Sequence, residues 1–412
     1  NGVLAQGDCG LPGNLSSLAD AVFQKTGGKQ GPLVQQLSQR YSLKTATPNE
    51  GHEIAAALLF EGVISSVVTL NFDLALSIAI GALGAGESVG IIEGPDDILK
   101  QQTCNLYYLH RNANADPEDW VLRTAAIGQD WKDRWDAALV PKAMATPIVL
   151  FVGMGSPADV LVESARHIRA VMPKGSVAYQ VDPGASGASA FSQALSLAAG
   201  SHIQAKWCTF MNTVGQRHVD EQAIRVRTAA ADLVRQNRLG TEDISYLLAR
   251  VRAMGLIQFG RLRANWLLHK KPYQPDLPAN RHLVADLLLA AAMIARETGT
   301  TALLFDNGLV EFRRGDQVVS SHVFVSGGGT RRRAAVESEL SSRRRKYRGL
   351  AKPPSGAVVA GTTDAVGFAA TPPTDLISGD AADDIVSGTW ALPMFHTEVL
   401  RQDPVRCRQV AP

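Results

Sequence analysis

Three short apolar runs decide the fold class: Ile148-Val149-Leu150-Phe151-Val152, Ser176-Val177-Ala178-Tyr179-Gln180-Val181 and His202-Ile203-Gln204-Ala205-Lys206-Trp207. Each run is rich in apolar residues and has the length of a strand buried in a sheet. The stretches between them, residues 158–171 and 188–199, have the spacing of amphipathic helices. This alternation of strands and helices predicts a parallel sheet with crossover helices.

The same alternation extends toward the N-terminus. Residues 63–69, 89–92 and 105–109 are predicted as strands, and residues 16–24 and 50–61 as helices. We therefore expect residues 1–213 to form an α/β domain with a Rossmann-like, doubly wound and mainly parallel sheet.

Beyond residue 213 the pattern changes to long helical periods. Four stretches have this period: 221–236, 241–254, 262–269 and 281–298. Asp306-Asn307-Gly308 joins two strand-like runs and predicts a hairpin, and residues 317–325 offer a third strand. Residues 353–373, rich in Gly, Pro, Ala and Thr, are interpreted as a loop. We expect residues 214–412 to be a mostly helical region with a small β element.

The composition gives no support to several classes of protein. The chain has 412 residues, with 41 Lys and Arg against 39 Asp and Glu, so its bulk charge does not indicate nucleic acid or a membrane surface. The four cysteines form no C-x-x-C pair, which argues against a zinc ribbon or a redox dithiol. The longest apolar stretch, residues 74–85, is too short to span a bilayer, and no secretion signal is recognisable. We expect a cytoplasmic protein.

One segment departs from this neutral balance. Residues 331–333 are all Arg, and Arg343-Arg344-Arg345-Lys346-Tyr347-Arg348 follows shortly after. A solvated basic helix fits this pattern, and so does a surface that binds nucleic acid or an acidic partner. The preceding Ser326-Gly327-Gly328-Gly329-Thr330 lacks the G-K-[ST] ending of a P-loop and predicts no ATP site.

Polar residues follow the predicted strands of the N-terminal domain at their carboxyl ends, where doubly wound sheets bind ligands. The groups at these ends are Thr69-Leu70-Asn71-Phe72-Asp73, His110, Gly153-Met154-Gly155-Ser156-Pro157 and Asp182. Upstream, the Gly-rich loop Gly7-Asp8-Cys9-Gly10-Leu11-Pro12 could offer backbone N–H groups to a phosphate. Each signal also has a structural interpretation, since Asp182-Pro183-Gly184 is a turn signal and Asp73 suits a helix cap.

Together and in this order, the motifs resemble the sirtuin-like superfamily, whose members cleave the nicotinamide–ribose bond of NAD. Thr69-Leu70-Asn71-Phe72-Asp73 is similar to the family signature T-x-N-x-D. Residues 106–110 resemble the strand that leads to the family's catalytic His, with Arg111 in place of the usual Gly. Residues 149–157 resemble the strand and G-x-S turn against the adenosine ribose, and residues 120–124 the short strand that follows the His. Gly10-Leu11-Pro12 is similar to the end of the phosphate loop, although the preceding residues depart from G-A-G-x-S.

The resemblance implies that Asn71 and His110 are catalytic. The amide of Asn71 could hold an attacking water, and an imidazole with an unperturbed pKa of about 6.5 suits a base at neutral pH. The residues expected to bind NAD are Gly7, Asp8, Pro12, Thr69, Asp73, Gly153, Gly155, Ser156 and Asp182. The zinc cysteines of protein deacetylases are missing from the sequence, so we expect no zinc and no cofactor beyond NAD as substrate.

The resemblance therefore implies an NAD hydrolase that produces nicotinamide and ADP-ribose. Zinc-less sirtuin-like domains with an unrelated C-terminal region resemble NAD-depleting effectors of bacterial antiviral defence. That similarity implies a homo-oligomer and a partner such as a nucleic-acid-translocating ATPase or a nucleic-acid-guided sensor. The alternative is a catalytically silent sensor or scaffold that binds a nucleotide, which the altered loop before Gly10 favours. An ordinary Rossmann oxidoreductase is opposed by the lack of a G-x-G-x-x-G after the first strand.

Overall fold

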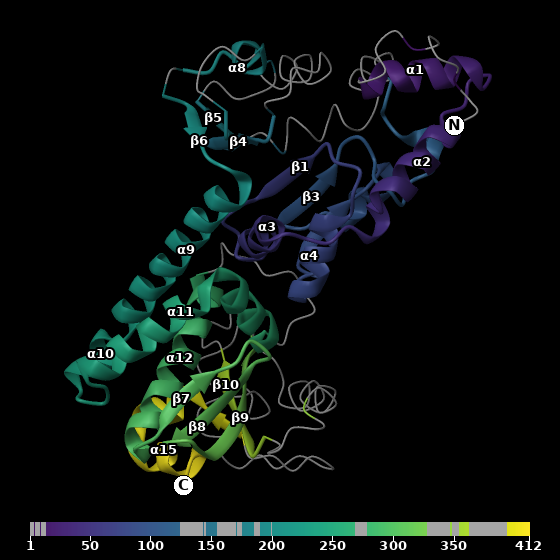
Figure 1. The fold of residues 1–412 in the computed structure, drawn as a ribbon. Helices are drawn as coiled ribbons and strands as arrows, with labels where there is room; N and C mark the ends of the chain where they lie inside the picture. The colour runs from purple at the N-terminus through teal and green to yellow at the C-terminus, as the bar shows by residue number, and fades with distance from the viewer. Residues whose placement is uncertain are drawn as a thin grey trace. The chain divides into compact units, whose positions relative to one another are not determined.

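The chain forms two compact units, Asn1–Val214 and Gly215–Pro412, which we call unit 1 and unit 2 (Figure 1). The division falls within a single long helix, α9 (Trp207–Ala229). A computed structural model describes residues 14–123, 146–154, 175–184, 190–198, 200–267, 278–327, 354–361 and 394–412, and the single positions Leu4, Cys9, Ala143, Ala170 and Tyr347.

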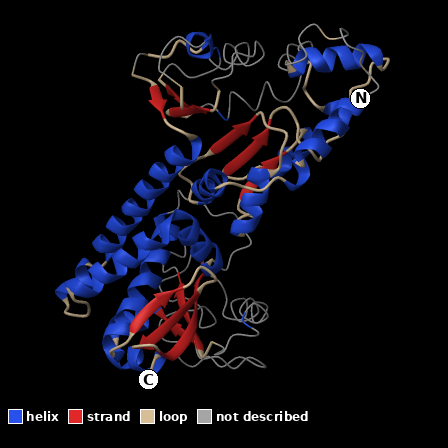
Figure 2. Cartoon of the chain, viewed as in Figure 1, coloured by secondary structure: helices blue, strands red, loops and turns tan. Residues whose placement is uncertain are grey.

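Unit 1 is a mixed α/β structure with short strands (Figure 2). Its helical elements are α1 (Leu15–Lys25), α2 (Gly31–Tyr41), η1 (Leu43–Thr45), α3 (Glu50–Phe60), α4 (Ala75–Leu83), η2 (Pro95–Lys100), η3 (Pro117–Asp119) and α8 (Ala190–Ala194). Its strands are β1 (Ser66–Thr69), β2 (Val89–Ile92), β3 (Cys104–Tyr108), β4 (Ile148–Val152), β5 (Val177–Asp182) and β6 (His202–Gln204).

The strands of unit 1 form two parallel three-stranded sheets, in the orders β1-β3-β2 and β4-β5-β6. In the first sheet, Thr69 lies opposite Tyr108. In the second sheet, Val152 lies opposite Val181. Apolar side chains beside both sheets pack into one core cluster, which contains Leu109, Val149, Phe151, Ala178 and Leu195 with Val68 and Leu70 against it. The two sheets of unit 1 therefore share this core cluster.

Local signals explain where several helices of unit 1 begin and end. The Oδ1 atom of Asn14 accepts a hydrogen bond from the Ser17 N–H at 3.1 Å and caps α1. Asn49 and His52 form a reciprocal capping box at the start of α3. Helix α4 ends at Gly84, whose φ of 82° lies in the left-handed region that favours Gly.

The indole of Trp207 packs against the start of α3. Its Nε1 donates to the Oδ1 of Asn49 at 3.3 Å, and Gly51 faces the ring with no side chain of its own. Because Trp207 begins α9, the strand expected over residues 202–207 ends at Gln204. The helix expected over residues 158–171 lies outside the described residues apart from Ala170.

Unit 2 contains long helices and a five-stranded sheet. Its helices beyond α9 are α10 (Ala231–Arg235), α11 (Thr241–Trp266), α12 (Pro278–Thr298), α14 (Thr397–Gln402) and α15 (Pro404–Val410). Its strands are β7 (Thr301–Leu304), β8 (Leu309–Arg314), β9 (Gln317–Gly327), β10 (Gly356–Gly361) and β11 (Met394–His396). The order is β11-β10-β9-β8-β7, antiparallel from β7 to β9 and parallel from β9 to β11, and α12 packs against the sheet.

This sheet is larger than the small β element expected from the sequence. Strand β10 lies within residues 353–373, which the flanking Gly and Pro residues marked as a loop. Its residues 357–360 are fully buried, and the strand pairs in parallel with β9 on one side and β11 on the other. The predicted helices 241–254 and 262–269 are one element, α11, interrupted at Gly255 with a φ of 65°.

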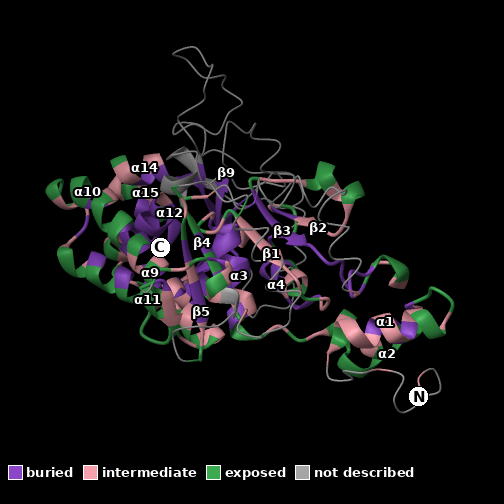
Figure 3. Ribbon diagram, turned by 90° about the horizontal axis from the view of Figure 1, so that it is seen from above, coloured by how far each residue is buried: buried purple, intermediate pink, exposed green. Residues whose placement is uncertain are grey.

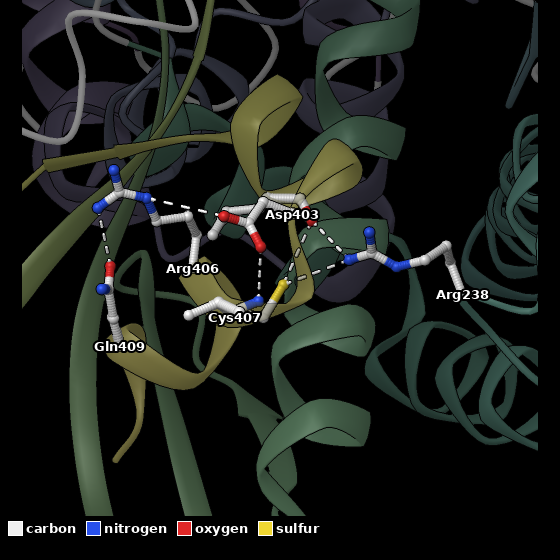
Figure 4. A network of polar contacts seen from close by, with 7 residues as sticks. Arg238, Asp403, Arg406, Cys407 and Gln409 are labelled. Carbon is white, nitrogen blue, oxygen red and sulfur yellow. Dashed lines mark hydrogen bonds and ion pairs between the residues drawn. The ribbon is translucent and has the colours of Figure 1, made fainter.

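Polar contacts fix the C-terminal helices to the rest of unit 2. Arg238 donates through Nη1 to the Arg401 carbonyl at 2.8 Å and through Nη2 to the Leu400 carbonyl at 2.9 Å (Figure 4). The Sγ of Cys407 donates to the same Leu400 carbonyl at 3.3 Å, and burial raises the pKa of this thiol to about 12. Nε2 of His322 lies 2.6 Å from the Val410 carbonyl, and only a protonated ring nitrogen can donate to it.

The expected basic segment is described at one position only. Tyr347 is buried against Leu309, Val323 and Val359, and its hydroxyl donates to the Asn307 carbonyl at 3.3 Å. The Arg residues of this segment lie outside the described residues. No helix within the described ranges has both the length and the apolar character that crossing a bilayer requires.

Candidate functional site

The loops that leave β1 and β3 run side by side at the carboxyl edge of the first sheet. The Leu109 N–H donates to the Thr69 carbonyl at 3.1 Å, and the Ala113 N–H donates to the Phe72 carbonyl at 2.8 Å. Asn71 and His110 lie on these two loops. The structure thus places the two predicted catalytic residues on neighbouring loops of one sheet edge.

The loop after β1 is shaped by its own polar side chains. The Oγ1 of Thr69 accepts from the Asn71 N–H at 3.1 Å, and the Oδ1 of Asp73 accepts from the Ala75 N–H at 2.9 Å in the first turn of α4. Asp73 therefore has the structural role of a helix cap. Asn71 itself is exposed, so its amide is available to a ligand.

His110 follows β3, which is buried along its whole length (Figure 3). The residue is 6% exposed, and its Nε2 is out of contact with solvent and hydrogen-bonded to none of the described residues. Burial lowers the pKa of His110 to about 4 because the charged imidazolium would lose its hydration. The ring is therefore neutral at pH 7, which is the form that accepts a proton.

The residue after His110 has an unusual backbone conformation. Arg111 has a φ of 72°, in the left-handed region that most residues with a side chain avoid. Next to it, Asn112 is fully buried and its Nδ2 donates to the Oε1 of Glu93 at 2.7 Å. This bond connects the segment after β3 to the segment after β2.

A short segment, residues 117–121, packs next to His110, and we call it the strap. The indole of Trp120 stacks on Phe72 with ring centroids 4.4 Å apart and parallel planes. The ring of Phe72 lies 6.4 Å from that of His110, and the Val121 N–H donates to the His110 carbonyl at 3.2 Å. Trp120 is 2% exposed. The strap therefore contacts the His110 loop through Phe72 and through one backbone hydrogen bond.

A cavity of about 580 Å³ opens beside this region, between the segments that follow β2 and β3. Its charged lining residues are Glu93, Asp96, Asp97, Arg111 and Asp119. Four carboxylates against one guanidinium create a negative potential, which repels phosphate groups. Neither Asn71 nor His110 lines this cavity. It is therefore a poor place for the pyrophosphate of a dinucleotide.

Two further predicted residues meet at the carboxyl edge of the second sheet. Gly153 directly follows β4 with a φ of 70°, and its N–H donates to the Val181 carbonyl at 3.1 Å. Asp182 ends β5, and its Oδ1 accepts from the Gly184 N–H at 2.7 Å, as in a turn. Both residues lie where a ligand of a parallel sheet is expected, and the carboxylate of Asp182 also stabilises its own loop.

Five predicted ligand-binding residues lie outside the described residues: Gly7, Asp8, Pro12, Gly155 and Ser156. Residues 120–123, expected to enter a short strand, form none. Within the parts of the chain that are described, no group of three or more His, Cys, Asp and Glu side chains is arranged to hold a metal ion.

The sequence patterns gave no functional weight to several residues around the site. Phe72, Trp120 and Gln30 lie around the His110 loop. His52 lies near Asp73: burial lowers the pKa of His52, and the Asp73 carboxylate offsets only part of this lowering. Gln30 and His52 are far from the strand ends in sequence. A sequence motif defined by the residues that follow strands therefore cannot identify Gln30 or His52 as neighbours of the site.

Comparisons with known proteins add no assignment. No protein-family model matches the chain, and a search of curated proteins finds no match to it.

Proposed function

We propose that this protein is an NAD hydrolase that releases nicotinamide and ADP-ribose. The observation that supports it is the position of Asn71 and His110 on adjacent loops at the carboxyl edge of β1 and β3. An exposed amide and a neutral imidazole on neighbouring loops provide a water-positioning group and a proton acceptor.

The reaction needs little acid catalysis, because nicotinamide leaves NAD as a neutral molecule from a cationic ring. Asn71 holds a water molecule near the anomeric carbon of the nicotinamide ribose, and His110 accepts a proton from that water. The water oxygen bonds to the carbon as the bond to the pyridine nitrogen breaks. The remaining contribution is geometric, since the site orients the ribose and excludes competing water.

NAD is proposed to bind at the carboxyl ends of the strands of the two sheets. Ligands of Rossmann-like sheets bind outside the carboxyl ends of the strands, and Thr69, Gly153 and Asp182 lie at the carboxyl ends of β1, β4 and β5. The loop with Gly7, Asp8 and Pro12 and the turn with Gly155 and Ser156 would complete this Rossmann-like site. The acidic cavity between the segments after β2 and β3 is not part of this proposed NAD site.

The left-handed backbone of Arg111 agrees with this proposal. Sirtuin-like proteins, which the motifs resemble, usually have Gly at the corresponding position, and a positive φ is the conformation for which Gly is selected. Arg111 adopts it at a cost of about 1 kcal/mol.

The wider proposal follows the same resemblance. Unit 2 would act as an assembly and regulatory region of a cytoplasmic, homo-oligomeric effector of antiviral defence. Residues 331–348 would contact nucleic acid or an acidic partner, such as a guided sensor or an ATPase. A second candidate, a silent nucleotide sensor, is favoured by one observation: Nε2 of His110 is closed off from solvent.

The test is to incubate the protein with NAD and measure free nicotinamide and ADP-ribose. We expect Asn71→Ala and His110→Ala each to reduce turnover by roughly 100-fold or more, as loss of a positioned acid–base group does. His202→Ala, in β6 of the same unit, is the matched control and should retain turnover. Full activity in both site variants, or no product from the wild type in any assembled form, would refute the hydrolase.

A further inference from the structure

The strap that packs next to His110 is attached to the N-terminus of α2 through Gln30 and Gly31. Nε2 of Gln30 donates to three strap carbonyls, those of Pro117 at 2.9 Å, Glu118 at 3.1 Å and Trp120 at 2.7 Å. The Glu118 carboxylate accepts from the Gln30 N–H at 2.9 Å and the Gly31 N–H at 2.8 Å. These contacts join segments 88 positions apart in the sequence.

Helix α2 has a physical need for this partner. Its N-cap residue Gln30 makes no capping bond with its own side chain, and its first turn contains no acidic residue. The first N–H groups of a helix have no acceptor within the helix and carry partial positive charge. Both carboxylate oxygens of Glu118 supply the missing acceptors from outside the helix. The carboxylate therefore acts as a distant cap that holds the strap in place.

The same strap also contacts Phe72 and the backbone of His110. Trp120 stacks on Phe72, and the Val121 N–H donates to the His110 carbonyl. With the strap in this position, Nε2 of His110 has no contact with solvent. A base that is closed off from solvent cannot take a proton from water. In the conformation described here, Nε2 is therefore closed to proton exchange with water.

We propose that the strap, residues 117–121, is a gate over His110, and that Gln30 and Glu118 form the latch that keeps it shut. Glu118 is exposed at the surface, so its contacts with α2 can exchange with solvent without opening the core. Trp120, in contrast, is buried and must leave Phe72 when the gate opens. Release of the latch exposes the imidazole and allows it to act.

The catalytic role of His110 rests on the proposed hydrolase. The closing of the strap over His110 does not depend on that function. The experiment therefore measures the accessibility of His110 separately from turnover. Diethyl pyrocarbonate modifies neutral imidazoles that reach solvent, and mass spectrometry of the digested protein gives the extent of labelling at each His. His322, which is 1% exposed in unit 2, is the internal reference because general unfolding would expose it as well.

The variants are Gln30→Met, which removes three donated hydrogen bonds, and the milder Glu118→Gln, at an exposed position. The matched control is Gln35→Met, the same change at an exposed position of α2. We expect the ratio of His110 to His322 labelling to rise roughly 25-fold in Gln30→Met, which loses both amide protons, and roughly fivefold in Glu118→Gln, since one hydrogen bond contributes about a factor of five to an equilibrium. Gln35→Met should leave the ratio unchanged.

Turnover of NAD in the same variants separates the two proposals. A higher labelling ratio together with faster NAD cleavage supports the gate and the hydrolase. A higher ratio with no NAD cleavage supports the gate and refutes the hydrolase. If the ratio stays at the wild-type value in both variants, or changes equally in Gln35→Met, the strap is no gate and the proposal is overturned.

Discussion

Two deeply buried histidines, one in each unit, differ in what their rings contact. Burial lowers the pKa of both His110 and His322 to about 4. Nε2 of His322 donates to the Val410 carbonyl at 2.6 Å, and its ring lies among Phe312 and Phe395. Nε2 of His110 bonds to none of the described residues. Burial alone therefore does not identify a functional His, and the hydrogen-bond partner is the better guide.

The largest difference in stability between the two units is expected at low pH. Unit 2 contains His322 and His396, each with a pKa of about 4, while unit 1 contains His110 with a similar value. These folded-state pKa values lie below the unfolded value of about 6.5, so the unfolded chain binds more protons between these limits. The stability due to neutral imidazoles is present above about pH 6.5 and is lost as the pH falls toward 4, by on the order of 3 kcal/mol per His.

Hydrogen exchange at about pH 7 and about pH 4.5, corrected for intrinsic rates, measures this difference for each unit separately. We expect unit 2 to lose more protection free energy than unit 1, in which the pKa of His52 is lowered by a smaller amount than that of His110. Replacing His322 with Phe should reduce the pH dependence of unit 2. Equal losses of protection free energy in both units would contradict the attribution of this pH dependence to the buried histidines. So would an unchanged pH dependence of unit 2 in His322→Phe.

The second prediction concerns the hydrogen bond that distinguishes the two histidines. His322→Phe preserves an aromatic ring among Phe312 and Phe395 but leaves the Val410 carbonyl without its donor. At pH 7 we expect the free energy of unfolding of unit 2 to fall by about 2 kcal/mol, the cost of one unsatisfied buried group. Urea unfolding followed by the fluorescence of the buried Trp266 measures it. His110→Phe should change this transition much less. If it lowered the free energy of unfolding as much as His322→Phe does, the hydrogen bond of His322 would not distinguish the two histidines.

A smaller effect is expected at Arg238, which bonds the Leu400 and Arg401 carbonyls. Arg238→Met should lower the protection of residues 397–410 by about 1 to 2 kcal/mol in hydrogen exchange. Arg252→Met is the matched control, because its pair with Asp220 is at the surface, where such pairs contribute little. A control with the same loss would show that the Arg238 contacts contribute no more than an exposed ion pair.

The sequence could predict the features that depend on local pattern. Strands β2 and β4 occupy the predicted residues, and Asn71 and His110 lie on neighbouring loops because both follow parallel strands of one sheet. Strand β10 could not be found, since its small residues resemble a loop until β9 and β11 cover its edges. The latch between Gln30 and Glu118 was equally hidden, because nothing in either local segment indicates the other.

The packing of Trp207 against Gly51 has a consequence for dissecting the protein. A Cβ atom at position 51 would lie 2.0 Å from the Nε1 of Trp207, so even alanine at this position would displace the indole. A fragment of unit 1 that stops at the end of β6 would lack this ring and uncover the start of α3. A fragment of unit 1 that is to fold on its own should therefore extend past Trp207 into α9, and a proteolytic cut before that residue should destabilise it.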